Sequence, residues 1–404
     1  MTLDTPATNI TALAERLATE PMLAQVERWA LINSGTRNLP GLATMATSLA
    51  DAFAVLPGEV TLQVPSPVES VTSDGSVSQI DHGQHLLVTV RPQAPLQLLF
   101  TGHMDTVFSV DHPFQALAWQ GAGVLNGPGV ADMKGGIALL LAALKAVEAS
   151  PLASRIGYQV LINSDEETGS LSSAPLIAAS ARGKLAALTY EPALPDGTLA
   201  GARGGTGNFS ITVRGTSAHA GRNPEDGRNA IVAAAAIALA LSNARSPTFS
   251  VNPARIDGGG PNNVVPDLAI LRVNFRPKNG DEIARARALI ATVTEDVAAG
   301  HGVRIDVHGD FNRPPKPIDA GAAKLFGLVK ECGALLGLDI NWRDTGGVCD
   351  GNNIAACGIP VVDTMGARGG AIHSSDEFLI VDSLAERAAL SALTVLTIAE
   401  RGHL

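Results

Sequence analysis

Hydrophobic positions recur with two different periods along the chain, and together these periods predict an α/β protein. Apolar residues return at the spacing of a helix over residues 10–32, 42–54, 137–147, 320–336 and 381–399. Short apolar runs that are typical of strands occupy residues 60–64, 85–90, 96–100, 156–163, 185–190 and 360–365. Strands and helices that alternate in this way predict a sheet flanked by helices.

The pattern changes between residues 207 and 312. Strand, helix, strand, strand, helix and strand are expected there in turn, over residues 209–213, 229–241, 248–256, 268–275, 281–299 and 303–308. This is the split βαβ order of a small two-layer domain. Because the first pattern resumes afterwards, we expect residues 1–206 and 313–404 to form one domain that carries 207–312 as an insertion. A chain of 404 residues is also long enough for two cores.

Composition and charge narrow the classes of partner. The net charge of -10 argues against nucleic acid or an anionic membrane, because phosphate binding needs clustered Lys and Arg. Residues 1–20 mix charged and apolar positions, unlike a signal peptide, and no apolar run is long enough to span a bilayer. Because we expect neither a signal peptide nor a membrane span, we expect a cytoplasmic location by default. The three cysteines have neither zinc nor redox spacing, so we expect them to be reduced.

The segment 98–107 is the first place along the chain where polar side chains of interest follow a predicted apolar strand. This run ends in Thr-Gly and continues as His103-Met104-Asp105. In an extended chain His103 and Asp105 point to the same side, so the carboxylate can orient the imidazole. By itself the triplet fits an ordinary hydrogen-bonded pair equally well, and its meaning depends on whether further metal-binding residues lie at the ends of other strands.

Further acids occur where other predicted elements end or begin. The glycine-rich segment 127–136 could cradle a phosphate at the start of a helix, but its spacing fits neither nucleotide-binding fingerprint, and the alternative is a tight turn that presents Asp132. Asp165, Glu166 and Glu167 follow the strand 156–163. Three buried acids would need a cation, whereas on a surface loop they would be solvated. Glu191 follows the strand 185–190.

These positions predict a shared site. Parallel strands deliver their carboxyl ends to one sheet edge, and a late segment after another glycine-rich loop adds His373. Two histidines with three or four carboxylates suit two ions of the Zn²⁺ type that share one carboxylate. Of the adjacent pair Glu166 and Glu167, only one can face the metals in an extended chain, which leaves the other free as a general base.

The chain resembles the zinc-dependent peptidases and deacylases that include glutamate carboxypeptidase, acetylornithine deacetylase, succinyl-diaminopimelate desuccinylase and aminoacylase. The matching segments are residues 102–107, 129–136, 165–170, 191–192, 217–221, 263–266 and His373. The resemblance implies a mixed sheet of the dizinc exopeptidase type with an inserted two-layer α+β, ferredoxin-like domain that serves as lid and dimerisation module. It therefore also implies a homodimer.

The same resemblance implies a ligand set for two zinc ions per subunit, with cobalt or manganese as possible substitutes. Asp132 would bridge the ions. His103 and Glu191 would complete one site, and Glu167 and His373 would complete the other.

Further roles follow from the resemblance. Glu166 would be the general base that acts on a water bridging the metals, and Asp105 would orient His103. The peptide bond after Asp132 would be cis. In the insert, His219 would reach the active site of the partner subunit and stabilise the oxyanion. Substrate-carboxylate contacts would come from Asn263 and Arg276.

Three functions compete at this point. Residues 32–36 and 343–347, with Asp350, look most like the glutamate carboxypeptidase branch, which favours hydrolysis of an N-acyl or peptidyl amino acid with a free carboxylate. The second possibility is an N-acyl-amino-acid deacylase of the acetylornithine deacetylase type. The third is a binding protein that keeps the fold without metals. The presence of every ligand and of the base argues against the third.

Overall fold

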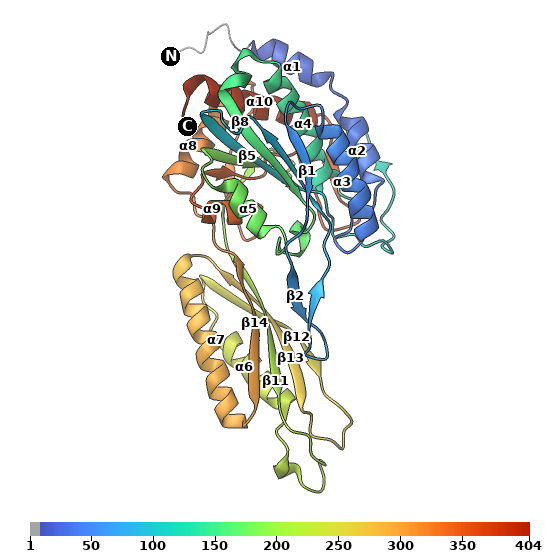
Figure 1. Cartoon of the computed structure of the whole chain (residues 1–404), viewed down its shortest axis with the longest axis vertical. Helices are drawn as coiled ribbons and strands as arrows, with labels where there is room; N and C mark the ends of the chain where they lie inside the picture. Colours follow the sequence, from blue (N-terminus) through green and yellow to red (C-terminus); the bar gives the residue numbers. More distant parts are fainter. Residues whose placement is uncertain (1–8) are drawn as a thin grey trace.

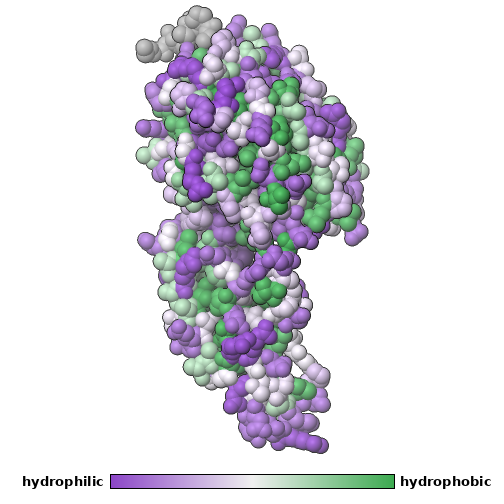
Figure 2. Space-filling view, viewed as in Figure 1, coloured by the Kyte–Doolittle hydropathy of each residue, from purple (hydrophilic) through white to green (hydrophobic). Residues whose placement is uncertain are grey.

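The computed structural model describes residues 9–404, which form two domains arranged end to end (Figure 1). The larger domain holds both ends of the described chain, and the inserted domain projects from it. Figure 2 shows a narrow waist between the two. Of the segment 1–20, which we expect not to be a signal peptide, residues 1–8 lie outside the described part. Within residues 9–404, no helix combines the length and apolar character needed to cross a membrane.

A six-stranded mixed sheet forms the centre of the larger domain, in the order β1-β4-β8-β5-β9-β16. Strands β8, β5, β9 and β16 run parallel, while at one edge β4 pairs antiparallel with β8 and β1 pairs antiparallel with β4. Their bounds are β1 Glu59–Gln63, β4 His85–Val90, β8 Ile156–Asn163, β5 Leu96–His103, β9 Ala186–Thr189 and β16 Val361–Val362.

Helices cover both faces of this sheet because successive strand residues point in opposite directions. Leu98 and Phe100 belong to the large core shared with the first group of helices, whereas Leu99 and Leu161 pack with the second group. The first group is α1 Ile10–Ala18, α2 Met22–Ala30, α3 Leu39–Phe53, α4 Gly136–Glu148, α8 Ala320–Leu335 and α10 Ser383–Arg401. The second is α5 Ala174–Ala181 and α9 Asp350–Ala356.

The segment 10–32 differs from the single helix that its periodicity predicts. It forms two helices, α1 and α2, separated at Pro21. Proline has no backbone N–H to donate and disfavours helical geometry in the residue before it, so the apolar pattern continues while the helix does not. The turn at residues 73–75 joins a hairpin that the sequence pattern did not reveal, β2 Val68–Val71 and β3 Val77–Ile80.

The inserted domain has the predicted split βαβ order. Its antiparallel sheet has the order β12-β13-β11-β14, and two helices cover one face (Figure 1). The elements are β11 Thr206–Arg214, α6 Ala230–Asn243, β12 Phe249–Gly258, β13 Leu268–Pro277, α7 Gly280–His301 and β14 Arg304–Arg313. It has a hydrophobic core of its own. The predicted fold class, a helix-flanked mixed sheet with an inserted α+β domain, is confirmed.

Local sequence signals explain where the helices of the insert start and stop. The Asn229 side chain accepts a hydrogen bond from the Val232 N–H at the start of α6, and Asn279 caps α7 in the same way. Helix α7 ends at Gly302, whose φ of +64° is accessible to glycine at little cost.

Short strands complete the larger domain and shape the loops around the sheet edge. Strands β10 Leu199–Arg203 and β15 Trp342–Thr345 pair in parallel. A small antiparallel sheet contains β6 Ala118–Trp119, β7 Val124–Asn126, β17 Gly369–Gly370 and β18 Phe378–Ile380.

Candidate metal centre

The predicted ligands gather at the carboxyl edge of the parallel strands β8, β5 and β9. His103 is the last residue of β5, Glu166 and Glu167 begin the turn after β8, and Glu191 follows β9. Asp132 lies just before α4, and His373 lies in the loop between β17 and β18. Parallel pairing therefore brings together side chains that are far apart in the sequence.

His103 is buried with its two ring nitrogens in different surroundings. Nε2 lies 3.0 Å from Oδ1 of Asp132 and 3.7 Å from Oε2 of Glu191. Nδ1 lies 3.0 Å from the backbone oxygen of Asp105. Burial lowers the pKa of His103, but the surrounding carboxylates outweigh it and raise the pKa well above the usual value. A proton on Nδ1 would be held by Asp105, which leaves Nε2 to bind a metal.

Asp105 makes more contacts than the strand pattern suggests. Strand β5 ends at His103, and the Asp105 carboxylate lies 3.5 Å from Nδ1, farther away than its own backbone oxygen. The carboxylate accepts hydrogen bonds from the Thr36 hydroxyl at 2.7 Å and from the N–H groups of Glu166 and Glu167 at 3.1 and 3.2 Å. Asp105 therefore fixes His103 and the turn of the two glutamates relative to each other.

The glycine-rich segment 127–136 forms a tight turn that presents Asp132, which is the second of the two interpretations of this segment. The peptide bond between Asp132 and Met133 is cis, as the family resemblance implies. The N–H groups of Gly129, Ala131 and Asp132 donate to the Glu377 carboxylate over 3.0 to 3.1 Å. These donors are therefore not available to a phosphate. Burial raises the pKa of Glu377 to about 7, and the charge of Asp132 acts in the same direction.

Two groups of metal-binding atoms share Asp132. One contains His103, Asp132 and Glu191, and the other contains Asp132, Glu167 and His373; within each group the ligand atoms lie within 4.8 Å of one another. Imidazole and carboxylate ligands in this number suit zinc and related ions. Nε2 of His373 lies 3.1 Å from Glu167 and 3.3 Å from Asp132, and these hydrogen bonds raise the pKa of His373 to about 10.

Glu166 belongs to neither group. Its side chain lines the pocket beside both groups and forms an ion pair of 2.8 Å with Arg313. Burial raises the pKa of Glu166 well above the usual value, although the charge of Arg313 opposes this effect. The third acid, Asp165, accepts hydrogen bonds from the N–H and hydroxyl of Ser172 at 2.7 and 2.9 Å. The three acids thus have three different environments.

Sequence reasoning missed the basic residues behind the site. Arg313, at the end of β14, also donates to the Glu166 backbone oxygen and to Ser170. Arg203, at the end of β10, forms a buried ion pair of 2.8 Å with Asp363. Both arginines lie where the insert joins the larger domain, and in the sequence such positions look like ordinary hinge charges. Only the tertiary contacts distinguish them.

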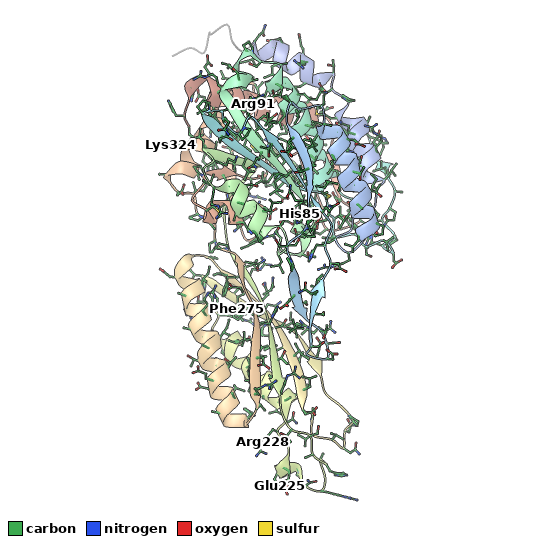
Figure 3. The ribbon with its side chains drawn as sticks, viewed as in Figure 1. His85, Arg91, Glu225, Arg228, Phe275 and Lys324 are labelled. Carbon is green, nitrogen blue, oxygen red and sulfur yellow. The ribbon has the colours of Figure 1, made fainter. Side chains whose placement is uncertain are left out.

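The insert places two predicted site residues at its outer end. The Ala220 N–H donates to the Asn263 backbone oxygen at 2.9 Å, so the loop of His219 lies beside the loop of Asn263. Figure 3 shows this end by Glu225 and Arg228, far from the larger domain. Neither His219 nor Asn263 lines the pocket of the metal ligands.

Arg276 lies at the opposite end of the insert, next to the hinge. Its Nε donates to Asn274 at 2.8 Å, and no described carboxylate pairs with it. Burial lowers the pKa of Arg276, and the positive charge of Arg313 lowers it further. Two neighbouring guanidinium groups, of which one has no acidic partner, favour binding of an anion at the base of the insert.

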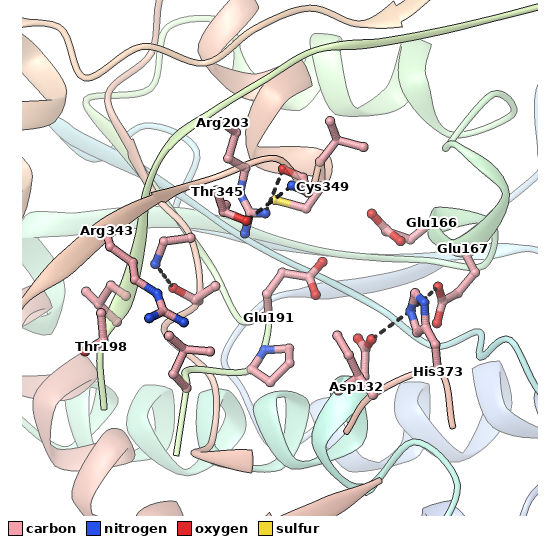
Figure 4. A pocket seen from close by; sticks show the side chains of 18 residues that line it. Asp132, Glu166, Glu167, Glu191, Thr198, Arg203, Arg343, Thr345, Cys349 and His373 are labelled. Atoms are coloured by element: carbon pink, nitrogen blue, oxygen red, sulfur yellow. Dashed lines mark hydrogen bonds and ion pairs between the residues drawn. The ribbon is translucent and has the colours of Figure 1, made fainter. Parts of the chain in front are cut away.

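A cavity of about 320 Å³ opens from the metal ligands toward β10 and β15 (Figure 4). Asp132, Glu167 and His373 lie at one end, Glu191 lies in the middle, and Arg343 lies at the other end. A volume of this size is typical of a site for a small molecule. The arrangement combines a buried carboxylate outside both metal-binding groups, two potential metal sites and room for a substrate.

Sequence comparisons agree with this site. Residues 99–397 match the model of peptidase family M20/M25/M40. The chain is 28% identical to carboxypeptidase G2 of Pseudomonas sp. (strain RS-16) over 78% of this chain and 77% of that protein. It is 30% identical to succinyl-diaminopimelate desuccinylase of Psychrobacter arcticus, over 72% of this chain and 75% of the relative.

Solved structures share the fold. A tripeptidase from Staphylococcus aureus superposes with a TM-score of 0.71 at 23% identity, covering 96% of this chain and 99% of the other. A dinuclear metal-binding peptidase from Bacillus subtilis gives 0.66 at 16% identity, covering 96% and 99%. The family resemblance seen in the motifs is confirmed: this chain belongs to peptidase family M20/M25/M40 and is a metal-dependent amide hydrolase.

Proposed function

We propose that this enzyme hydrolyses the amide bond of an N-acyl or peptidyl amino acid with a free carboxylate, as a glutamate carboxypeptidase-like enzyme with two zinc ions per subunit. The observation that carries the proposal is the position of Glu166. It is a buried carboxylate that faces the pocket beside two metal-binding groups and belongs to neither of them. Cobalt or manganese could replace zinc, because both bind the same ligand types.

The residues of the site divide the work of hydrolysis. When bound, the two metal ions would supply Lewis acidity and lower the pKa of water. Glu166 accepts the proton of the attacking water and returns it to the leaving nitrogen. Arg313 holds Glu166 in place at 2.8 Å, and Asp105 anchors the backbone of the same turn.

The free carboxylate of the substrate would bind at the base of the insert. Arg276 has no acidic partner among the described residues and lies near Arg313. An arginine fork can bind a carboxylate through two hydrogen bonds. The relative named carboxypeptidase G2 supports an amino acid as the leaving group. The relatives named desuccinylase favour a second candidate, an N-acyl-amino-acid deacylase.

A substrate panel with zinc-loaded enzyme separates the two candidates. We expect release of glutamate or another amino acid from acyl and peptidyl amides that have a free α-carboxylate, and loss of turnover when this carboxylate is amidated. Liquid chromatography of the products is the measurement. Efficient deacetylation of acetylornithine, with no turnover of the acyl and peptidyl amides, would instead favour the deacylase.

We further propose a homodimer formed through the insert, in which His219 and Asn263 act on the partner subunit. Their place at the outer end of the insert, away from the pocket of their own subunit, supports this arrangement. A cytoplasmic location stays a proposal that rests on the free cysteines Cys332, Cys349 and Cys357.

Replacement of His219 by Ala tests the role of the insert. We expect kcat to fall by roughly a hundredfold or more, as when one oxyanion donor is removed, while the dimer persists. Steady-state kinetics and light scattering after size exclusion measure the two properties. His403→Ala, near the exposed chain end, is the control. An unchanged kcat in His219→Ala would refute the oxyanion role.

A further inference from the structure

The cavity that opens from the metal ligands has apolar side chains in its walls and polar side chains at its far end. Every residue that lines it belongs to the larger domain. Apolar side chains form part of its walls: Pro192, Leu194, Leu199, Val348 and Ile372. The far end is polar, with Thr198 and Arg343 side by side in Figure 4. A ligand that extends from the metal site would therefore lie along apolar side chains and reach a guanidinium at the far end.

Arg343 has no partner of its own. It is exposed on β15, and its side chain forms no hydrogen bond or ion pair with any residue in 9–404, although its backbone pairs with β10. Two nearby acids accept hydrogen bonds from the backbone. Asp344 accepts one from the Ala202 N–H, and Asp196 accepts one from the Thr198 N–H, both at 2.9 Å. These hydrogen bonds of Thr198, with a smaller effect of Arg343, lower the pKa of Asp196.

The second arginine of the cavity is different. Arg203 is buried and forms an ion pair of 2.8 Å with Asp363, a carboxylate that also pairs with Lys316 at 3.2 Å. Its side chain also donates a hydrogen bond to the backbone oxygen of Gly347 at 3.1 Å. The fold therefore satisfies Arg203 within the protein and leaves the Arg343 guanidinium free to bind a ligand.

Which half of the substrate enters this cavity can be inferred from the proposed function, and this step rests on that function. The amino-acid carboxylate binds at Arg276 in the insert, whereas the cavity is formed by the larger domain alone. The scissile amide lies at the metal ligands between them. The acyl half of the substrate therefore occupies the cavity and extends toward Arg343.

We propose that Arg343 is a specificity-determining residue that binds an anionic group at the far end of the acyl half. The preferred substrates would then be half-amides of dicarboxylic acids or peptides with an acidic residue before the cleaved bond. Methylene groups would lie against the apolar walls, and the terminal carboxylate would pair with the guanidinium, which binds carboxylates bidentately. An anion at this end is also separated from the acidic metal ligands by the length of the cavity.

Arg343→Gln tests the proposal with pairs of substrates that have the same amino acid. Succinyl, glutaryl and adipoyl amides are compared with the acetyl and butanoyl amides, which lack the second carboxylate. For the best anionic acyl group we expect kcat/KM to fall roughly ten- to a hundredfold in the variant, the range for a lost charge-assisted hydrogen-bonded pair. The neutral amides should change less than about twofold. The control is Arg182→Gln, which removes the same charge at an exposed position between α5 and β9.

Binding provides a second readout that does not depend on turnover. Calorimetry of the zinc-loaded wild type should show tighter binding of glutarate than of butyrate, and Arg343→Gln should remove the difference. Equal affinity of the wild type for both acids would overturn the proposal, as would equal losses for neutral and anionic amides. If the neutral amides are hydrolysed without any preference for the anionic ones, the role of Arg343 fails and the proposed hydrolysis stands. If no amide is hydrolysed but the glutarate preference depends on Arg343, the proposed hydrolysis fails and the role of Arg343 in binding an anion stands.

Discussion

Replacement of Glu166 by Gln is expected to lower kcat by roughly a thousandfold while both metal ions stay bound. The amide keeps the size of the side chain and can still accept a hydrogen bond from Arg313, which lies 2.8 Å from Oε1. It cannot accept the proton of water, and general acid–base groups contribute about 10²- to 10⁴-fold to a rate. Glu166 lies outside both metal-binding groups, so the metal content should not change.

The measurements are steady-state kinetics and elemental analysis of the same preparation. Glu59→Gln, at an exposed position of β1, is the matched control and should behave as the wild type. Glu167→Gln gives the sharper contrast, because Glu167 belongs to a metal-binding group and its loss should reduce both metal content and turnover. Substantial turnover by a fully metal-loaded Glu166→Gln enzyme would exclude Glu166 as the base.

Replacement of Asp132 by Ala is expected to remove both metal ions and with them nearly all activity. Asp132 is the residue that the two metal-binding groups share. Outer-shell partners of a metal ligand are each worth about ten- to a hundredfold in affinity, so the loss of a ligand to both sites should exceed that range. The free energy of unfolding should also fall, because His103 and His373 each lose a hydrogen-bonding partner.

Calorimetric zinc titration and thermal unfolding of the metal-free proteins separate these two effects. Asp376→Ala removes an exposed acid close to His373 that belongs to neither group, and it should bind zinc as the wild type does. Two tight zinc ions in Asp132→Ala would show that the sites do not depend on this residue. Retained stability with lost zinc would show that the residue acts mainly as a ligand.

The sequence by itself determined the strands and the acids at their ends. The run 156–163 predicted β8 at its observed bounds, because a strand buried on both faces is apolar at most of its positions. His103, Glu166, Glu167 and Glu191 each follow such a run. Parallel strands end at one edge, so the place where these side chains meet was predictable from local patterns alone. Pro21 is also a local signal, because it ends one helix and starts another, but the helical spacing of apolar residues continues across it and predicted a single helix.

Tertiary structure decided what the acids do once they meet. Glu377 holds the loop of Asp132 from a position 245 residues away in the chain, and Arg313 pairs with Glu166 across 147 residues. Neither contact leaves a periodic trace in the sequence, since hydrogen-bond geometry depends on how distant segments pack. The distinction between a structural acid such as Asp165, a free acid and a ligand is therefore a property of the folded site. The same reason separates Arg203, which pairs with Asp363, from Arg343, whose side chain has no pair among the described residues: both are arginines, and their neighbours in the fold differ.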